Sequence, residues 1–574
     1  MRTDIAALIS DNLDIWTTAV ERKSGVGRGG RKLGFHGIER LRALILDLAV
    51  RGKLVPQDAE DEPAHNALRK IAKARQQKLA AGIARKPKAL APLPADLTRL
   101  PSGWAWTQLG TIAEIGPGNS AADDIEASFV PMAMISTSIS GEHGIEIRKW
   151  GEIKKGFTQF AEGDIGLAKI TPCFENGKAA IFQNLRNGIG AGTTELHVAR
   201  PWSEDVNRRY LLLTMKTGSY LAKGEKQMTG TAGQKRVTRA YFEASPLPLP
   251  PLAEQQRIVA KVDELMALCD ALEEQSASAL AVHQTLVETL LATLVNSADA
   301  TDLATNWARL KIHFDILFST EAAIDALKQT VLELAVRGRL VPQNENDPSV
   351  LLPNFREVSK SSEWDKKVFL YGSKIFALPK NWTFAPLSQL CSHIVDCPHT
   401  TPKWTDDGEL CVRTNQIKPR HLDLSEPNFV SAKTYVERVE RLEPAPGDIL
   451  YIREGGILGV GCRIPGGVRL CLGQRSMLIR CNPTVAPEYV EIALNSPFVV
   501  SIAKHFTTGG AAPRVNMSTV RGYPIPTPPL AEQQRIVAKV DELMALCDKL
   551  KARLFDAAAT QKQLAAAIVE RAAA

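Results

Sequence analysis

One stretch of the chain occurs twice without a single change. The residues from Pro250 to Asp270, PPLAEQQRIVAKVDELMALCD, are identical to those from Pro528 to Asp548. Both copies begin with two prolines and a glutamate, which suit a first helical turn because proline loses no hydrogen bond there and a carboxylate favours the positive end of the helix dipole. No glycine or proline follows in residues 252–295 or in residues 530–574. The sequence therefore predicts two long helices.

Each of these helices carries one narrow apolar stripe. Its core-type positions step by alternating four and three residues, which is typical of a coiled-coil seam. Such a stripe needs a partner of matching length, and the obvious partner is the other copy. The residues expected to pair the helices are Ile258, Val262, Leu265, Cys269, Leu272, Ile536, Val540, Leu543, Cys547 and Leu550.

Two further pairs of segments extend the repeat. Residues 38–57 resemble residues 324–343, and each segment predicts an amphipathic helix that ends at a glycine with a proline four residues later. An LPxxW motif follows in each half and ends at Trp104 or Trp382. The chain is therefore a duplicated unit of short helix, variable region and long helix.

The expected fold class is α+β. Two mixed α/β domains are separated by two long antiparallel coiled-coil helices, and the internal duplication implies pseudo-two-fold symmetry. In each variable region, short β-prone runs precede one helical run, at 208–221 or 486–504. The expected segments are an N-terminal helical extension with a basic Gly-rich tether (1–35), the first short repeat helix with a basic helix and linker (36–99), the first variable domain (100–249), the first long helix (250–296), a central region with the second short repeat helix (297–377), the second variable domain (378–527) and the second long helix (528–574).

Charge is unevenly distributed along the chain. The net charge is only +7, but every charged residue in 69–88 is basic, and residues 208–239 contain Glu225 as their single acid. Clustered Lys and Arg favour nucleic-acid binding through counterion release, and a solvated helix face or linker is the alternative. We expect a cytoplasmic protein with reduced cysteines and no membrane partner, because residues 1–23 include acids and we find no membrane-spanning apolar run.

Motifs for catalysis are missing from the sequence. It contains no [DNS]PP[YFW] loop with FxGxG, which would suggest an adenine methyltransferase, and no Walker pair. Residues 25–30 spell GxGxxG, but helical residues precede them, so a flexible tether is favoured over a nucleotide site. Residues 391–399 contain two Cys and two His without the paired spacing of structural zinc, so a polar turn is favoured over a metal site. We expect no catalytic residue and no metal in this chain.

Polar loops bounded by glycine recur at matching places in both variable regions. Arg, Lys, Asn and Gln pair with base edges, while Thr and glycine amides hold phosphates. An ordinary turn is the alternative for each loop. The candidate DNA-binding residues are Lys169, Thr171, Asn176, Lys178, Thr193, Thr194, Gln234, Lys235 and Arg236 in the first region, and His399, Lys403, Arg413, Asn415, Gln416, Arg453, Gln474, Arg475, Thr507, Thr508, Arg514 and Asn516 in the second.

The LPxxW motif, the P-x-PPLAEQQRIVAKVDEL helix start and the LAVRGKLVPQ helix end resemble those of the DNA-specificity subunit of type I restriction-modification systems, in the longer subgroup with an N-terminal extension. The resemblance spans nearly the whole chain. It implies that the variable regions are target-recognition domains, which the two conserved helices hold apart. Each domain would read one half of a split, asymmetric site in double-stranded DNA.

The resemblance also implies that this subunit is not an enzyme. It would recruit two methyltransferase subunits and, in the full complex, two ATP-dependent restriction subunits. S-adenosylmethionine, ATP and magnesium are expected in those partners, which methylate adenine N6 and cleave DNA, and no cofactor is expected in this chain. The alternatives are a single-chain DNA modification or cleavage enzyme with degenerate motifs, and a coiled-coil assembly scaffold that does not bind DNA.

Overall fold

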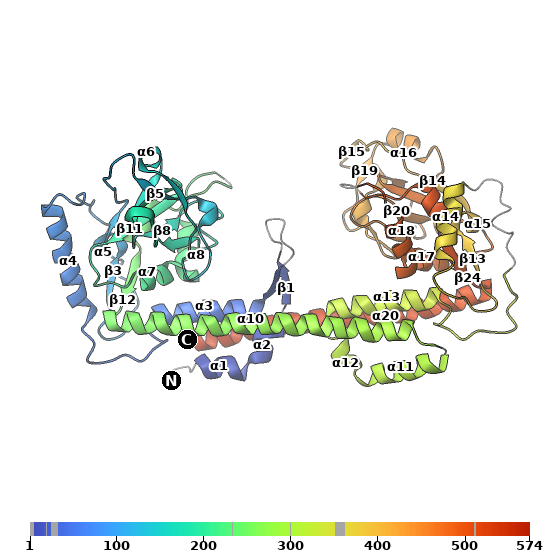
Figure 1. Ribbon diagram of the computed structural model, residues 1–574, viewed down its shortest axis with the longest axis horizontal. Coiled ribbons are helices and arrows are strands. Elements are labelled where there is room, and N and C mark those ends of the chain that lie inside the picture. Colours follow the sequence, from blue (N-terminus) through green and yellow to red (C-terminus); the bar gives the residue numbers. More distant parts are fainter. Residues whose placement is uncertain are drawn as a thin grey trace. The chain divides into compact units, whose positions relative to one another are not determined.

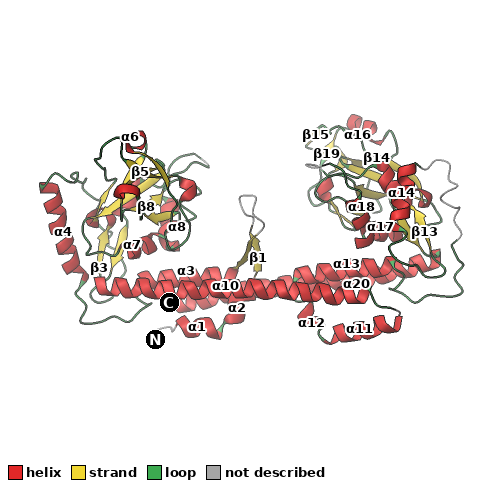
Figure 2. Cartoon of the chain, in the orientation of Figure 1, coloured by secondary structure: helices red, strands yellow, loops and turns green. Residues whose placement is uncertain are grey.

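The computed structural model describes residues 5–18, 20–23, 32–231, 233–298, 300–350, 362–509 and 513–573. Helices and sheets are mixed, and the chain divides into two compact units, residues 1–279 with 557–574 and residues 280–556. Each unit contains one variable domain and segments of both long helices, α10 (Leu252–Val295) and α20 (Leu530–Ala573) (Figure 1; Figure 2). Each long helix begins directly after its proline pair.

The first unit begins with two short helices and a hairpin. Its first elements are α1 (Ile5–Asp11), α2 (Leu13–Thr18), β1 (Val20–Lys23), β2 (Lys32–Phe35) and α3 (His36–Val50). A Cβ atom at Gly37 would lie 2.5 Å from the Trp16 backbone, so glycine lets α2 pack directly against α3. The predicted flexible tether is wrong at its two ends, because Lys23 and Lys32 pair in the β1–β2 hairpin, and the GxGxxG residues lie outside the described ranges.

The first variable domain consists of small sheets with helices packed against them. α4 (Ala64–Ala80) precedes this domain and packs against it. The helices within the domain are α5 (Leu109–Ile112), α6 (Trp150–Ile153), α7 (Arg208–Met215), α8 (Gly218–Lys226) and α9 (Arg239–Ala244). Its strands are β3 (Ala105–Gln108), β4 (Ala113–Ile115), β5 (Glu126–Val130), β6 (Glu146–Lys149), β7 (Thr158–Ala161), β8 (Ile165–Ala168), β9 (Ala179–Ile181), β10 (Ile189–Gly192), β11 (Leu196–Pro201) and β12 (Pro246–Leu249). The strand orders are β6-β5-β10-β7, β4-β11-β8-β9 and β12-β3, and β10 runs parallel to β5.

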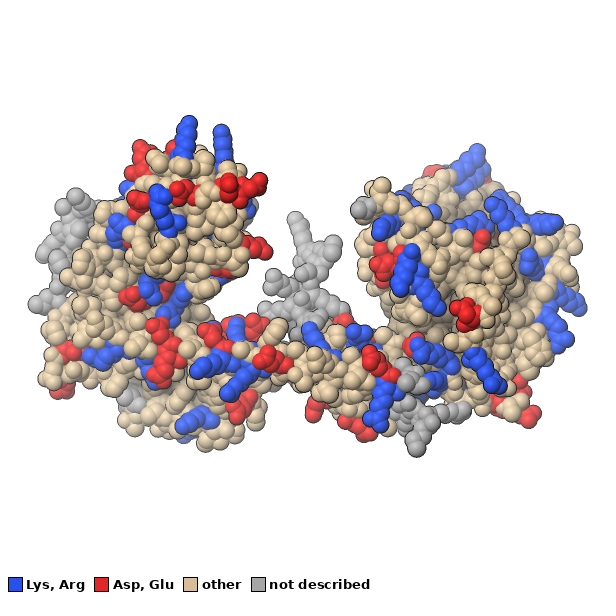
Figure 3. Space-filling model, turned by 180° about the vertical axis from the view of Figure 1, so that it is seen from behind, with Lys and Arg blue, Asp and Glu red and all other residues tan. Residues whose placement is uncertain are grey.

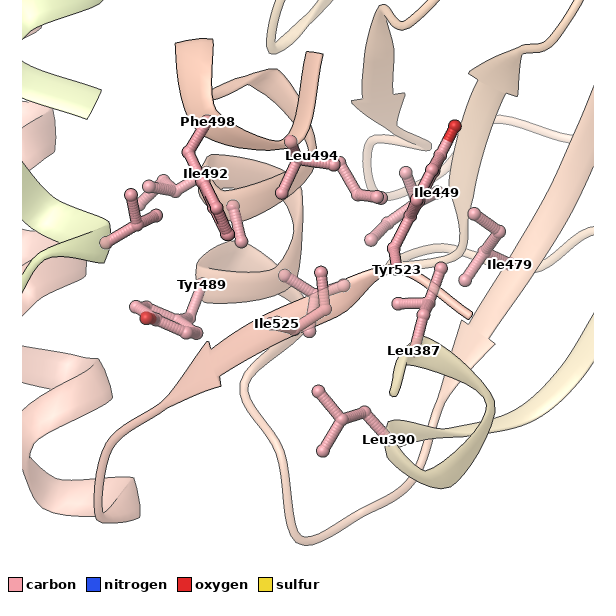
Figure 4. Packing of buried hydrophobic residues seen from close by; sticks show 14 of the residues in the cluster. Leu387, Leu390, Ile449, Ile479, Tyr489, Ile492, Leu494, Phe498, Tyr523 and Ile525 are labelled. Carbon is pink, nitrogen blue, oxygen red and sulfur yellow. The ribbon is translucent and has the colours of Figure 1, made fainter. Parts of the chain in front are cut away.

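The second variable domain has a corresponding plan. α14 (Glu363–Gly372) precedes this domain and packs against it. The helices within the domain are α15 (Leu387–Leu390), α16 (Ala432–Val439), α17 (Pro487–Asn495), α18 (Pro497–His505) and α19 (Met517–Arg521). Its strands are β13 (Thr383–Pro386), β14 (Cys391–Asp396), β15 (Trp404–Thr405), β16 (Glu409–Val412), β17 (Ile417–Lys418), β18 (His421–Leu422), β19 (Phe429–Val430), β20 (Ile449–Ile452), β21 (Gly461–Arg463), β22 (Cys471–Leu472), β23 (Ser476–Cys481) and β24 (Pro524–Thr527). The strand orders are β14-β23-β20-β21, β15-β19-β16-β22, β13-β24 and β17-β18. Leu387, Ile449, Tyr489 and Ile525 meet in its largest hydrophobic core (Figure 4).

The predicted helical run of each variable domain is divided into two helices. The runs 208–221 and 486–504 become α7 with α8 and α17 with α18. Thr217 accepts a hydrogen bond from the amide of Tyr220, and Ser496 accepts one from the amide of Val499, so each hydroxyl caps the second helix of its pair. The single-helix expectation is corrected for this reason.

The glutamine that follows the repeated glutamate joins each long helix to its variable domain. The side chain of Gln255 accepts a hydrogen bond from the Asn207 amide at 2.8 Å and donates one at 2.9 Å to the carbonyl five residues earlier. The side chain of Gln533 accepts a hydrogen bond from the Ala486 amide at 2.9 Å and donates one at 2.9 Å to the Pro528 carbonyl, again five residues earlier. Both glutamines are buried. Each one therefore couples the start of a long helix to the start of a domain helix.

In the first unit α3 lies antiparallel to α10. Arg42 forms ion pairs with Asp270 at 2.6 Å and Glu273 at 2.7 Å. Beyond the end of α3, Asp61 pairs with Arg257 at 2.5 Å, so residue numbers rise along α3 as they fall along α10. Of the stripe residues on this part of α10, Leu272 is half-buried and the buried ones are Ile258, Val262, Leu265 and Cys269.

In the second unit, α20 packs along α13, and α10 joins this packing further along α20. Ile536 and Val540 share a core with α13 (Glu321–Val336) and the second variable domain, and Leu543 packs at its edge. Cys547 shares a core with residues 287–294 of α10 and residues 323–327 of α13, and Leu550 packs against that core. The expectation that the whole stripe pairs with the other copy is therefore corrected, because α13 offers the nearer apolar face to the first turns of α20.

The central region contributes α11 (Ala300–Ile312) and α12 (Phe314–Leu317) besides α13. Within α10, an 18-residue window reaches a mean hydropathy of 1.3 and is 17% buried, so by length and composition this helix qualifies as a membrane span. The sequence-based statement that no such run exists is corrected on this point. One helix of this kind is weak evidence for a membrane-spanning segment. Val287, Leu291 and Leu294 of α10 pack in a protein core.

Candidate nucleic-acid interface

Three loops of the first domain, which the sequence presents separately, lie together. The Lys169 amide donates to the Glu195 carbonyl at 3.0 Å, and the Thr171 amide donates to the Lys235 carbonyl at 2.9 Å. The Val237 amide returns a bond of 2.8 Å to the Lys169 carbonyl. We call these loops the first loop cluster. It consists of residues 169–178, residues 192–195 and a third loop that is described at residues 229–231 and 233–236.

Arg236 holds the centre of the first loop cluster. Its guanidinium forms a two-pronged ion pair with Glu195, with nitrogen–oxygen distances of 2.9 Å and 2.7 Å. The hydrogen bonds from Arg236 lower the pKa of Glu195. The backbone of Arg236 also forms bridges with Ile170 of the first loop and with Thr229 of its own loop. This predicted base-reading residue therefore joins all three loops.

The remaining candidates of the first loop cluster differ in exposure. Lys169, Thr171, Lys178 and Thr193 are half-buried; Lys178 donates to the Met132 carbonyl at 2.9 Å, and Thr171 donates to Glu175 at 2.7 Å. These bonds hold the loops in shape. The exposed candidates are Asn176, Thr194, Gln234 and Lys235.

The second domain forms a corresponding cluster. The Arg453 amide donates to the Arg475 carbonyl at 3.3 Å, and the Gly455 amide donates to the Pro513 carbonyl at 2.9 Å. Thr508 and Arg514 exchange two backbone hydrogen bonds of 2.9 Å. We call this the second loop cluster, which consists of residues 453–460, 473–475, 507–509 and 513–516. Its exposed or half-exposed candidates are Gln474, Arg475, Thr507, Thr508, Arg514 and Asn516.

Two of the predicted base-reading residues of the second domain are buried in the fold. Arg453 is 6% exposed, and its guanidinium binds both oxygens of Asp396 at 2.9 Å and 2.7 Å. Gln416 is 4% exposed; it accepts a hydrogen bond from the Arg413 amide and donates one to the Glu426 carbonyl. The prediction for Arg453 and Gln416 is corrected, because both side chains are enclosed and committed to internal partners.

The polar turn that contains His399 and Lys403 lies against the second loop cluster. The Gln474 side chain donates to the His399 carbonyl at 3.1 Å and to the Thr401 hydroxyl at 2.8 Å. The Arg413 guanidinium lies 4.0 Å from the centre of the Trp404 ring, a cation–π contact. The exposed candidates in this area are His399, Lys403, Arg413 and Asn415.

The basic segment 69–88 forms α4 and the loop that follows it. Ala64, Ala67 and Ile71 are buried, so α4 is fixed to the domain by one face. Its other face is basic, and Lys and Arg side chains gather over this part of the first unit (Figure 3). Among the residues that the structure describes, Lys70 pairs with Glu62, whereas Lys73 and Lys86 form no ion pair.

The chain matches the family described as the type I restriction modification DNA specificity domain over residues 101–281 and 444–556. The EcoEI specificity subunit of Escherichia coli, a type I restriction enzyme subunit, is 41% identical over 596 residues, which cover 99% of each chain. The EcoAI specificity subunit of Escherichia coli is 41% identical over 587 residues, again 99% of each chain. This chain belongs to that family.

It is a specificity subunit of a type I restriction-modification system, as its motifs suggested, and the catalytic activities of such systems belong to other subunits. A solved structure from work on complex assembly and conformational transition of the type I R-M system is also similar. It is 18% identical, covers 83% of this chain and 99% of its own, and has a TM-score of 0.49.

Sequence reasoning missed two buried cations in this specificity subunit. Arg438 is 8% exposed and donates to the carbonyls of Leu472 at 2.5 Å and Gly473 at 2.8 Å, and to those of the 398–400 turn at 3.2 Å. Lys216 likewise bonds to carbonyls of two distant segments. Neither residue carries a local sequence signal, because all of its partners are backbone atoms far away in the sequence.

Two pairs of cysteines in the second domain of the specificity subunit lie opposite one another in strand pairs. Cys391 faces Cys481 across β14 and β23, and Cys411 faces Cys471 across β16 and β22. Within the described ranges, no group of three or more His, Cys, Asp or Glu residues is placed to hold a metal ion.

Proposed function

We propose that this specificity subunit reads a bipartite, asymmetric site in double-stranded DNA, with one half-site bound by each variable domain. The observation that carries the proposal is that both domains gather three polar loops into one cluster by corresponding backbone bonds. The loops carry different side chains at the two sites, so the half-sites differ in sequence. The exposed Arg, Lys, Asn, Gln and Thr side chains of the clusters supply base-edge and phosphate contacts.

The two long helices set the spacing between the half-sites. The repeated junctions and the antiparallel pairing of each short repeat helix with its long helix support a pseudo-two-fold arrangement of the two halves. Such an arrangement turns the two variable domains toward opposite strands of the DNA duplex, as in dimeric DNA-binding proteins. Lengthening both helices by a whole heptad would then change the spacer and leave the half-sites unchanged.

We infer the partners from membership in the family, which supports them. The subunit recruits two methyltransferase subunits and, in the full complex, two restriction subunits, and it works in the cytoplasm, where the DNA lies. S-adenosylmethionine, ATP and magnesium act in those partners, while this chain supplies sequence recognition without a cofactor of its own.

A domain exchange tests the proposal. Residues 100–249 are replaced by residues 378–527, the chimera is assembled with its methyltransferase subunits, and the methylated motif is read by sequencing of the modified DNA. The expected motif is a palindrome of the second half-site. An unchanged motif would contradict one-domain, one-half-site reading. Turnover by the purified subunit alone, with S-adenosylmethionine or magnesium, would favour a single-chain enzyme instead.

A further inference from the structure

Lys216 is a buried cation that bonds only to backbone carbonyls. Its ammonium lies 2.6 Å from the Ser138 oxygen, 2.8 Å from the Gly177 oxygen and 3.3 Å from the Thr137 oxygen. The residue is 7% exposed, and no carboxylate among the residues described pairs with it. Burying a charge without a counterion costs free energy unless each of its protons forms a hydrogen bond. Here the three N–H donors of the ammonium have three carbonyl acceptors.

The carbonyl of Gly177 lies at the end of the first and longest loop of the first loop cluster. This loop, residues 169–178, leaves β8 and returns into β9 at Ala179. Because the same ammonium also binds residues 137–138, Lys216 ties the returning end of the loop to a second segment of the domain. The placement of the loop therefore depends on a side chain that is itself enclosed.

Asn495 occupies the corresponding position in the second domain. Lys216 and Asn495 each directly precede the hydroxyl residue that caps the second helix of the split pair, Thr217 or Ser496. The Asn495 side chain donates to the Gly461 carbonyl at 2.8 Å and accepts from the Gly461 amide at 3.1 Å. Gly461 begins β21 directly after the loop 453–460 that leaves β20. Each domain thus anchors the far end of the same loop from the same point of the fold, with a different chemical group.

We propose that Lys216 and Asn495 are positioning residues for DNA recognition, and that each one sets the placement of the recognition loop in its own domain only. This inference rests on the proposed bipartite function. Hydrogen bonds to base edges need side chains placed to within about 0.5 Å, so a loop that loses its anchor loses base discrimination before it loses phosphate contacts. Because both anchors bond to backbone atoms, they hold the loop whatever side chains it carries.

The test compares K216M with N495L in the full chain, assembled with its methyltransferase subunits. Each complex selects binding sites from a randomised duplex library, and the base preference at every position of both half-sites is measured. In the wild type we expect each specific base pair to be preferred by roughly 5- to 150-fold. K216M should reduce this preference to below about 3-fold in the first half-site and leave the second unchanged, and N495L should do the reverse.

K223M is the matched control for K216M, because it removes the same charge from the neighbouring α8, where Lys223 is exposed. It should leave both half-site preferences intact. Variants K216Q and N495Q keep hydrogen-bonding groups and serve where an apolar replacement fails to fold; we expect a partial loss confined to the same half-site. The conservative variants separate an anchor from a residue that is needed only for folding.

The possible results distinguish the inference from the function on which it rests. Equal loss at both half-sites, or unchanged preference in a folded K216M or N495L complex, would overturn the positioning role. A wild-type selection that yields one continuous site read by a single domain would overturn the bipartite function itself.

Discussion

The indole nitrogen of Trp104 donates a hydrogen bond of 2.9 Å to the carboxylate of Glu254, in a buried setting. Trp104 ends the LPxxW motif at the entrance of the first domain, and Glu254 lies in the first turn of α10. The second half repeats the contact between Trp382 and Glu532 at 3.0 Å. Two motifs that recur 150 residues apart in each half are therefore two sides of one junction.

Replacing Trp104 with Phe should loosen this junction. The variant keeps an aromatic ring and removes the donor, so a buried carboxylate oxygen loses a hydrogen bond at a cost of about 1–3 kcal/mol. Urea unfolding of the full chain measures the change. W106F is the matched control, because Trp106 is half-buried and its indole donates an exposed hydrogen bond to a backbone carbonyl, and it should cost less than about 1 kcal/mol. Equal losses in the two variants would show that the Glu254 contact adds no stability.

Removing positive charge from α4 and the loop that follows it should weaken DNA binding without changing the recognised sequence. Lys73 and Lys86 are exposed, and each one that touches a phosphate contributes about 0.9 to the slope of log affinity against log salt. For K73Q/K86Q we therefore expect a slope shallower by up to about 2, measured by titration of duplex DNA at several salt concentrations. K311Q/K549Q removes two exposed lysines from the helical regions outside the domains and should leave the slope unchanged. The same slope in both double variants would assign α4 to a solvated face.

The stability of the wild-type protein should rise with pH above neutrality because of Lys216. Burial, followed by the nearby Arg209 charge, lowers the pKa of Lys216 to about 7 from an ordinary value of 10.5. Between these two values the unfolded chain binds one proton more than the native protein, so the free energy of unfolding increases by up to about 1.4 kcal/mol per pH unit. Below about pH 7 this dependence disappears.

Urea unfolding at pH 6.5, 7.5 and 8.5 checks this expectation. K216M should lack the increase, since it cannot titrate. If K216M kept the same increase as the wild type, another group would be responsible.

Replacing Asp396 with Asn should destabilise the second domain strongly. The variant leaves the Arg453 guanidinium, 6% exposed, without its carboxylate, and breaking such a buried pair costs about 3–5 kcal/mol. Thermal or urea unfolding measures the loss, and recognition of the second half-site should fall with it. E409Q is the control, because its Arg469 partner is exposed and such a pair contributes less than about 1 kcal/mol. A loss as small as that of E409Q would contradict a structural role for Arg453.

The sequence by itself determined the helical frame and the family of this protein. The proline pairs, the following glutamates and the long stretches without glycine or proline act within one or two turns of the chain, so the starts of α10 and α20 are visible in the residues alone. The exact repeat likewise showed that the Glu-Gln pair at each helix start occurs twice, but not that these side chains bind the variable domains. Sequence reasoning gave Glu254 a role at a helix start, and only the fold supplied Trp104 as its partner.

Only the tertiary structure decided how the loops and their side chains are used. Arg453 has the residue type of a base reader, but Asp396, which lies far away in the sequence, neutralises it inside the fold. The loops of each cluster meet through backbone bonds, which leave no mark on side-chain identity, and Lys216 and Asn495 bind backbone atoms in the same way. Short-range signals fix helices because their hydrogen bonds are local, whereas the placement of a recognition surface depends on contacts between distant segments, which form only when the chain has folded.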